Sequence, residues 1–343
     1  MTQMSCSADA RATSEALEQP LPLSGLLALA MTGFIAILSE TLPAGLLGQI
    51  SAGMHISEAM AGQLVTVYAL GSVLTAIPLV TMTQGWRRRP VLLLAIVGFL
   101  LFNTLTAVSQ SYLLTLVARF MTGVAAGLAW GVIAGHARRM VSPAQQGRAM
   151  AVAMIGAPVA LSLGVPAGTW LGELIGWRAT FGWVSASSVA LIVWVLCTVP
   201  DFEGHKPGQR PGIGQVLRTP GVLAVLLVIL AWVLAHNVLY TYIVPYLTAA
   251  GMAASTGWVL LTFGLAALAG IALVGTWIDR HLRSMVVLSL VGFAAVALVM
   301  GFSGQSPTLV FLSVALWGLT YGGAPTLLQT ASADAAGEGA DVA

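Results

Sequence analysis

Long runs of apolar residues, separated by short polar segments, make up most of this chain. A helix needs about 20 mainly apolar residues to cross a bilayer, and the runs have this length. Because a membrane-spanning segment must satisfy its own backbone groups, runs of this length predict an all-α, polytopic membrane helical bundle. We expect ten spans, at 23–48, 60–82, 91–108, 112–133, 149–170, 180–199, 222–247, 256–277, 285–302 and 308–329.

The composition agrees with this pattern. Of the 343 residues, 58% are hydrophobic and only 8% are charged, which is too little polar material to coat a water-soluble surface. The formal net charge of +2 does not favour nucleic acid as a partner. The two cysteines form no disulfide framework, and no metal-ligand cluster or Gly-Lys-Ser/Thr phosphate loop is present. We therefore expect no metal, no cofactor and no use of ATP.

The basic residues predict the orientation of the spans. Loops that follow even-numbered spans hold most of the Lys and Arg, and positively charged loops stay in the cytoplasm. The first twenty residues are acidic rather than basic, so the first span does not resemble a cleaved signal peptide. Both termini are therefore expected in the cytoplasm. The basic residues are Arg87, Arg88, Arg89, Arg138, Arg139, Arg148, Lys206, Arg210, Arg218, Arg280 and Arg283.

A polar stretch after the sixth span divides the chain. It is rich in Pro and Gly and lacks apolar periodicity, so it predicts a linker. Six spans precede it and four follow, an arrangement that suggests two repeated halves. The expected organisation is a cytoplasmic tail at 1–22, a six-helix half at 23–200, a cytoplasmic linker at 201–220, a partial four-helix half at 221–330 and a polar tail at 331–343.

Two charged side chains, Glu40 and Arg119, fall inside predicted spans. A charge at mid-bilayer costs roughly 2.5–3.5 kcal/mol on insertion scales, so such residues usually face an interior or a wet cavity. At about 1.5 Å per residue both lie roughly 10–12 Å below the outer surface, so they could meet. One interpretation is a structural ion pair. The other is that Glu40 loads and releases a proton while Arg119 tunes it or holds its structure, since arginine itself stays charged.

Candidate substrate-binding residues are few. The seventh span offers His236, Asn237 and Tyr240, the second Gln63 and the fourth Trp130. A substrate of a two-half transporter would lie between the halves, in a mainly apolar cavity with a few polar groups. Asn237 and Tyr240 share a helix face, although interhelical hydrogen bonds would explain them equally well. Because few charges are embedded, we expect a neutral or singly charged solute.

Two motifs indicate a family. The fourth span carries LVARFMTGVAAG around Arg119, and the fifth carries GAPVALSLGVPAG followed by GWRATF. This combination resembles the drug/proton antiporter branch of the major facilitator superfamily, which exports drugs, sugars or nucleosides. The resemblance implies a proton-coupled inner-membrane exporter that is not an enzyme, with protons, a small solute and the lipid bilayer as partners. It assigns the antiporter motif to Gly156, Pro158, Gly164, Pro166 and Gly168.

The resemblance also implies gating residues. Family members carry Gly-x-x-x-Asp-Arg in the loop after the second span, and this motif governs their conformational switch. Here the first copy keeps only Arg88 and Arg89, while the second copy has Gly275, Asp279, Arg280 and Arg283. We expect Asp279 to pair with a cation or to cap a helix start. The alternative is that these residues are loop charges that set topology.

Other readings stay open. Members of the family normally have twelve spans, so a chain of ten is expected to be truncated, and a non-transporting remnant or a subunit is an alternative. A distant alternative is an intramembrane serine hydrolase, because residues 301–304 read Gly-Phe-Ser-Gly and Ser303 would need a histidine such as His236. Ser303 is expected near the end of a span and His236 in the middle of another, which disfavours this reading.

Overall fold

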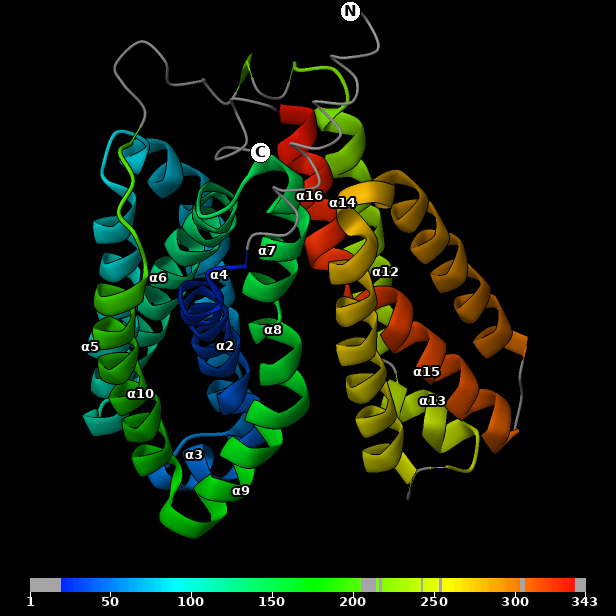
Figure 1. Cartoon of the computed structure of the whole chain (residues 1–343). Helices are drawn as coiled ribbons and strands as arrows, with labels where there is room; N and C mark the ends of the chain where they lie inside the picture. The colour runs from blue at the N-terminus through cyan, green and yellow to red at the C-terminus, as the bar shows by residue number, and fades with distance from the viewer. Residues whose placement is uncertain are drawn as a thin grey trace, which may run out of the picture.

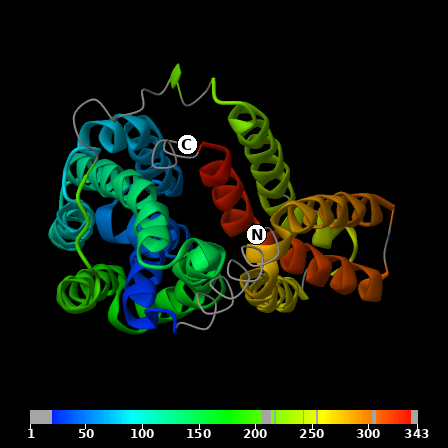
Figure 2. The ribbon, with the colours of Figure 1, turned by 45° about the horizontal axis from the view of Figure 1, so that its top comes forward.

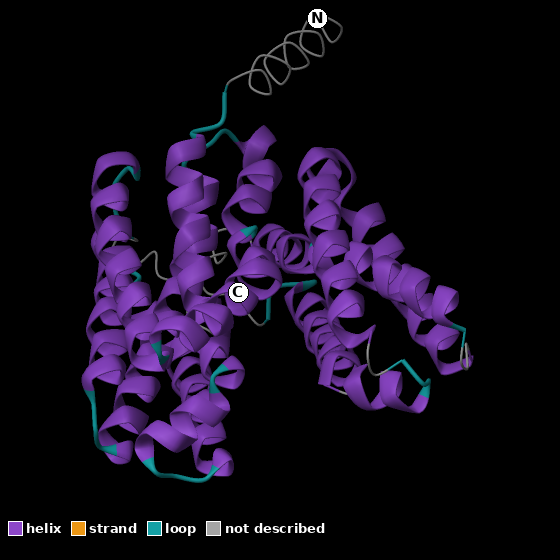
Figure 3. Cartoon of the chain, turned by 90° about the horizontal axis from the view of Figure 1, so that it is seen from below, coloured by secondary structure: helices purple, strands orange, loops and turns teal. Residues whose placement is uncertain are grey.

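A computed structural model describes residues 20–204, 214–215, 218–241, 243–252, 255–302 and 306–336. Within these ranges the regular structure is helical throughout, with no strand (Figure 3). The expected all-helical membrane fold is therefore confirmed. Most of the expected linker, and the hydrolase candidate Ser303, lie outside the described residues.

The first group of helices forms a bundle, drawn in blue to green in Figure 1. Its helices pass mostly up and down, with the short helices α3 and α9 at one end of the molecule. They are α2 (Leu23–Gly45), α3 (Leu47–Met54), α4 (Glu58–Thr83), α5 (Arg88–Val108), α6 (Tyr112–Arg139), α7 (Gln146–Met154), α8 (Gly156–Val159), the π-helical turn η2 (Ala160–Gly164), α9 (Val165–Ile175) and α10 (Trp177–Thr198).

The second group lies beside the first. Figure 2 shows its last helix, α16, reaching between the first bundle and the other helices of the second group. The members are α12 (Val222–Thr241), α13 (Ile243–Ala249), α14 (Thr256–Phe302), α15 (Pro307–Gly322) and α16 (Ala324–Ala336).

Nine stretches of helix in the described residues are long and apolar enough to cross a membrane, against ten expected spans. The difference lies in α14, which contains both predicted spans 256–277 and 285–302. The segment between them has no Gly or Pro to end a helix, and only His281 leaves helical geometry, with φ −135° and ψ 27°. The loop that we expected between these two spans is a sharp bend at His281, and it divides α14 into two limbs (Figure 1).

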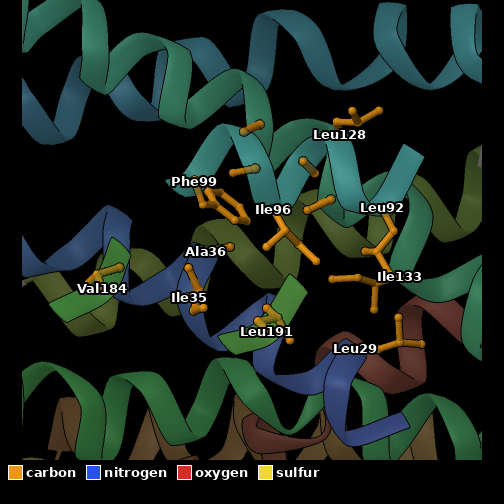
Figure 4. Close-up of a cluster of buried hydrophobic side chains, with 14 of the residues drawn as sticks. Leu29, Ile35, Ala36, Leu92, Ile96, Phe99, Leu128, Ile133, Val184 and Leu191 are labelled. Carbon is orange, nitrogen blue, oxygen red and sulfur yellow. The ribbon is translucent and has the colours of Figure 1, made fainter. Parts of the chain in front are cut away.

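The buried apolar side chains form two main clusters. The larger cluster joins α2 to α7 and α10 and also includes Ile271 of α14, and Figure 4 shows part of it, including Ile35, Ile96 and Phe99. The second cluster joins α12 to α16 around Trp232 and Trp317. Each group of helices thus supplies most of one core, and Ile271 is the member of the second group that packs into the first core. The division into functional halves with the expected boundaries stays a prediction.

Basic residues gather at one end of the molecule, which we call the basic end. Arg139 Nη1 donates to the main-chain oxygen of Glu203 at 2.9 Å, joining the end of α6 to the segment after α10. Arg138 Nη2 pairs with Asp334 at 2.9 Å. Asp334 lies near the end of α16. This helix continues to residue 336, which is six residues into the expected polar tail.

Asp201 caps the start of α5 from a distant part of the chain. Its Oδ1 accepts a hydrogen bond from the main-chain N–H of Arg89 at 3.1 Å, and its Oδ2 accepts from Arg87 Nε at 2.5 Å. Partial burial raises the pKa of Asp201, but these hydrogen bonds and the two arginine charges outweigh it and hold the pKa below its ordinary value. An acid at a helix start also complements the helix dipole.

We expect Asp201→Asn to lower the melting temperature of the detergent-purified protein slightly at pH 7. The ionised carboxylate stabilises the fold above its unfolded pKa of about 3.9, and this contribution disappears as pH falls through the lower folded pKa. The difference between wild type and variant should therefore shrink on acidification. Glu203→Gln is the matched control, because its main-chain contact with Arg139 does not need the carboxylate. A difference independent of pH would contradict this account.

Candidate functional site

Arg119 lies fully buried where α2, α4 and α6 cross. Its Nη2 donates to the main-chain oxygen of Ser39 at 2.6 Å and to that of Glu40 at 3.4 Å, and its Nε donates to the oxygen of Leu64 at 3.3 Å. The guanidinium therefore ties α6 to two neighbouring helices through their carbonyl groups. Its Nη1 has no partner among the described residues.

A proline explains why a carbonyl of α2 is available to Arg119. In a regular helix the oxygen of Ser39 would accept the N–H of residue 43, but residue 43 is Pro43 and has no N–H. The freed oxygen is the atom that Arg119 contacts most closely, at 2.6 Å. The cation thus replaces a missing backbone donor. Hydrogen bonds to charged groups contribute about 1.5–3 kcal/mol each, so this contact is a strong one.

Aromatic rings enclose the same guanidinium. Its central carbon lies 4.9 Å from the Tyr68 ring centroid and 5.7 Å from that of Phe181. Both distances are within the range of cation–π attraction. The Tyr68 hydroxyl donates to the main-chain oxygen of Ala36 at 2.8 Å, and Asn103 Nδ2 donates to Ser39 Oγ at 2.9 Å. These contacts fix the side chains and carbonyl groups around Arg119, and none of them involves another charged group.

The Glu40 side chain is half-buried beside this cluster. Glu40 and Arg119 were expected at the same depth in the bilayer, and they do lie in contact. The contact is made by the main-chain oxygen of Glu40 and not by its carboxylate. No ion pair within 4.0 Å joins the two side chains in the described part of the chain, so the structural ion pair is not formed here. Likewise, the Glu40 carboxylate has no hydrogen-bond partner there. The Glu40 side chain is therefore not held by a direct contact with Arg119, and its role in proton coupling stays a prediction.

His236 lies in an aromatic cluster on α12, α14 and α15. Trp317 Nε1 donates to His236 Nδ1 at 3.2 Å, and the Tyr321 ring stacks on the imidazole at 3.5 Å between centroids. Phe263 packs against the same imidazole. An Nδ1 that accepts a hydrogen bond leaves the proton on Nε2, so His236 is a neutral imidazole. Tyr240 lies nearby with its side chain partly exposed.

The other substrate candidates occupy separate places. Asn237 is on α12, but its side chain lies outside the described residues. Gln63 is exposed on α4, whereas the adjacent Leu64 is buried. Trp130 lines a cavity with residues of α4, α12 and α16, and neither His236 nor Gln63 lines it. The structure therefore brings His236 and Tyr240 together and does not join all five candidates in one pocket.

The antiporter-motif helix packs closely on α2. A methyl group at Gly156 would overlap with the main-chain oxygen of Ala30, one at Gly164 would press on Phe34, and one at Gly168 would press on Leu42. Glycine at these positions allows the two backbones to approach. Pro158 lies within α8. Pro166 is the second residue of α9, which follows the π-helical turn directly, as expected where a proline removes a backbone donor.

Asp279 lies at the seam between the two groups of helices. Its Oδ1 accepts a hydrogen bond from the N–H of Gly147 at 2.6 Å, at the start of α7, and its Oδ2 lies 3.8 Å from Arg148 Nε. Gly275, on the same limb of α14, faces Ala151 of α7. Asp279 therefore caps a helix start across the seam. Its role in a conformational switch stays a prediction.

The remaining gating candidates divide by location. Arg88 is buried at the start of α5, and its N–H donates to the oxygen of Phe202 at 2.9 Å. Arg89 Nη1 reaches the oxygen of Val199 at 3.5 Å. Arg280 and Arg283 are exposed at the bend of α14. The first-half arginines thus hold helix ends together, whereas the second-half ones are open to solvent.

Sequence reasoning missed two residues that the structure places in these networks. Pro43 frees the carbonyl that Arg119 binds, and Asp334 pairs with Arg138. Pro43 was detectable, because it follows Ser39 by four residues in the span that also carries Glu40. Asp334 was not, because it lay past the last apolar run and its partner is distant in sequence.

Known proteins resemble this chain in sequence and in fold. A sequence model described as Major Facilitator Superfamily matches residues 29–342. The purine ribonucleoside efflux pump NepI of Escherichia coli O6:K15:H31 is 31% identical over 287 residues, which are 83% of this chain and 72% of NepI. The transcription regulatory protein OpdE of Pseudomonas aeruginosa is 30% identical over 314 residues, which are 90% of this chain and 78% of OpdE.

Solved structures share the fold. The proton:xylose symporter XylE, bound to 6-bromo-6-deoxy-D-glucose, superposes with a TM-score of 0.73 over 94% of this chain and 84% of XylE. The two sequences are 12% identical, so this likeness concerns the fold alone.

We expect a double-mutant cycle to couple Pro43 with Arg119. Arg119→Lys should destabilise the protein by about 1–3 kcal/mol, because carbonyl groups lose their donor. In a Pro43→Ala background the cost should fall, since alanine supplies an intrahelical N–H to Ser39. The four proteins would be compared by unfolding in detergent, with a coupling of at least about 0.5 kcal/mol expected.

Pro78→Ala is the control for that cycle. Pro78 lies inside α4 with an exposed side chain, away from the Arg119 contacts. Its effect should add to that of Arg119→Lys without coupling. Equal costs of Arg119→Lys in the wild-type and Pro43→Ala backgrounds would show that the proline does not prepare the carbonyl for the arginine.

Proposed function

The chain belongs to the Major Facilitator Superfamily, and from that premise we propose that it exports purine nucleosides by alternating access in exchange for protons. It is a multi-pass membrane transporter. Export and the nucleoside class are supported by its similarity to NepI, a purine ribonucleoside efflux pump. The antiporter motif of α8 to α9 also supports export. Sugars and amphipathic drugs are the competing substrate classes.

The observation that carries proton coupling is the placement of Arg119. Its permanent charge is fully buried and fixed on main-chain oxygens, while the Glu40 carboxylate nearby has no hydrogen-bond partner among the described residues. An ionised Glu40 balances this charge, whereas a protonated Glu40 leaves one net positive charge in a poorly polarisable interior. Proton binding at Glu40 therefore changes the electrostatic energy of the site. A helix rearrangement that opens the site to water would relieve that energy.

Contacts at the basic end provide a gate for this cycle. Asp279 joins α14 to the start of α7, and Arg138 joins α6 to Asp334 on α16. All of these contacts cross between the two groups of helices. We assign them to the state in which the basic end is closed, and access from that side requires that they separate. Because charged groups regain hydration when exposed, their separation is feasible in a transport cycle.

The role of Glu40 is tested with purified protein in vesicles under an imposed pH gradient. A gradient of one pH unit corresponds to about 1.4 kcal/mol, which supports about tenfold accumulation of radiolabelled inosine by one-to-one antiport. We expect Glu40→Gln to reduce accumulation to about the level without a gradient, while exchange of inosine against inosine continues. A parallel panel with a sugar and a cationic drug identifies the substrate class.

Glu58→Gln is the matched control, because Glu58 is exposed at the first turn of α4. It should accumulate inosine like the wild type. Full gradient-driven accumulation by Glu40→Gln would remove Glu40 from the coupling mechanism. Transport of the sugar or the drug without transport of inosine would replace the nucleoside assignment and leave the antiport mechanism in place.

A further inference from the structure

A cavity of ≈ 240 Å³ lies between the first bundle and α16, toward the basic end. Its walls come from α4, α6, α12 and α16, so both groups of helices contribute. The position of α16 between the groups is visible in Figure 2. The lining combines an apolar α4 wall with the aromatic ring of Trp130 and the polar side chains of Arg138, Gln329 and Ser332.

Each of these three polar side chains carries a buried atom without a hydrogen-bond partner among the described residues. The atoms are Arg138 Nη1, Gln329 Oε1 and Ser332 Oγ. Ser332 is only 4% exposed. Leaving a buried polar atom unpaired destabilises a fold, and most such atoms in proteins are paired with protein, water or ligand. Three in the lining of one cavity leave hydrogen-bonding capacity there that water or a bound molecule can use.

The donor and acceptor types specify that molecule. A guanidinium N–H only donates, an amide oxygen only accepts, and a hydroxyl does both. The molecule must therefore offer an acceptor to Arg138 and a donor to Gln329, and it can offer either to Ser332. Hydroxyl groups meet all three demands. The Trp130 ring in the same wall provides an apolar surface on which a planar ring can stack.

Charge and size narrow the choice further. Among the described residues of the lining, Arg138 is the only charged one, and its Nη2 already pairs with Asp334 at 2.9 Å. Because this pair is neutral overall, the cavity has no spare positive charge for a phosphate group. Small-molecule sites usually measure about 300–1,000 Å³, so ≈ 240 Å³ limits the solute to about one nucleoside.

We propose that this cavity is a binding site for an uncharged nucleoside, loaded from the basic end, and that it selects nucleosides against nucleotides. The proposal rests on the proposed function and assigns a site to its substrate. The ribose hydroxyls pair with Gln329 and Ser332, and Arg138 donates to an acceptor of the solute. Once the contact between Arg138 and Asp334 has re-formed behind the solute, Asp334 acts as a positioning residue, because it holds Arg138 in place and neutralises its charge.

Binding of radiolabelled inosine to the full chain in lipid nanodiscs tests the site. We expect Ser332→Ala and Gln329→Met to raise the Kd for inosine by about 5- to 10-fold each, since each removes one hydrogen bond and little volume. Thr330→Val is the matched control. Thr330 lies on the same helix and is also buried without a partner, but it does not line the cavity. Its Kd should equal that of the wild type.

A second arm tests the charge argument at low ionic strength, where exposed charges are little screened. Inosine 5′-monophosphate should not compete with inosine on the wild type. Asp334→Asn leaves the Arg138 charge unbalanced, so the monophosphate should then compete. A purely structural role of Asp334 would lower the binding of both compounds and would not change this preference.

The outcomes separate this proposal from the proposed function. Wild-type Kd values for both Ser332→Ala and Gln329→Met would overturn the site, while gradient-driven accumulation of inosine in vesicles would leave the export function standing. Absence of saturable inosine binding to the wild type would also overturn the site. Conversely, binding that is lost in Ser332→Ala, without any accumulation under a pH gradient, would support the site and remove the antiport function.

Discussion

The arrangement depends on one contact, the hydrogen bond from the Arg119 guanidinium to the main-chain oxygen of Ser39. Pro43 cannot supply the N–H that this oxygen would otherwise accept. The carbonyl near the end of α2 therefore gains a donor, and the buried guanidinium gains an acceptor. Three helices are thereby joined at a point where no solvent can replace a lost partner. The contact uses the main-chain oxygens of α2, so among the described residues the Glu40 carboxylate is not paired with Arg119, and the structural role of the arginine does not depend on that carboxylate.

A second constraint acts at the basic end, where charged contacts join the two groups of helices beside a smaller apolar contact of Ile271 with the first bundle. The cores are largely separate, and the Asp279 and Arg138 contacts cross between the groups. Charged contacts near water have small net energies, because the separated groups regain hydration. Apolar cores are costly to expose. A molecule built in this way can open its seam without unfolding either group.

The aromatic cluster around His236 and the cavity beside Trp130 use polar groups differently. In the first, Trp317 satisfies the imidazole and selects its tautomer. In the second, the side chains of Gln329 and Ser332 hold unpaired atoms against an otherwise apolar wall. Pairing within the fold rigidifies a polar group, whereas an unpaired atom keeps its capacity for a hydrogen bond. The aromatic cluster around His236 does not line the cavity beside Trp130. Both groups of helices contribute side chains to that cavity.

Hydropathy established the helical membrane architecture, because the length of an apolar run and the cost of a buried charge are local properties of the chain. It also singled out Glu40 and Arg119, and the motifs around Arg119 and in the fifth span indicated the family. The partners of these residues depended on how the helices cross. Only the folded chain placed the guanidinium on carbonyl groups and brought Arg138 beside Asp334, because both contacts link residues that are far apart in the sequence. The bend at His281 was also not predicted, because no Gly or Pro marks it.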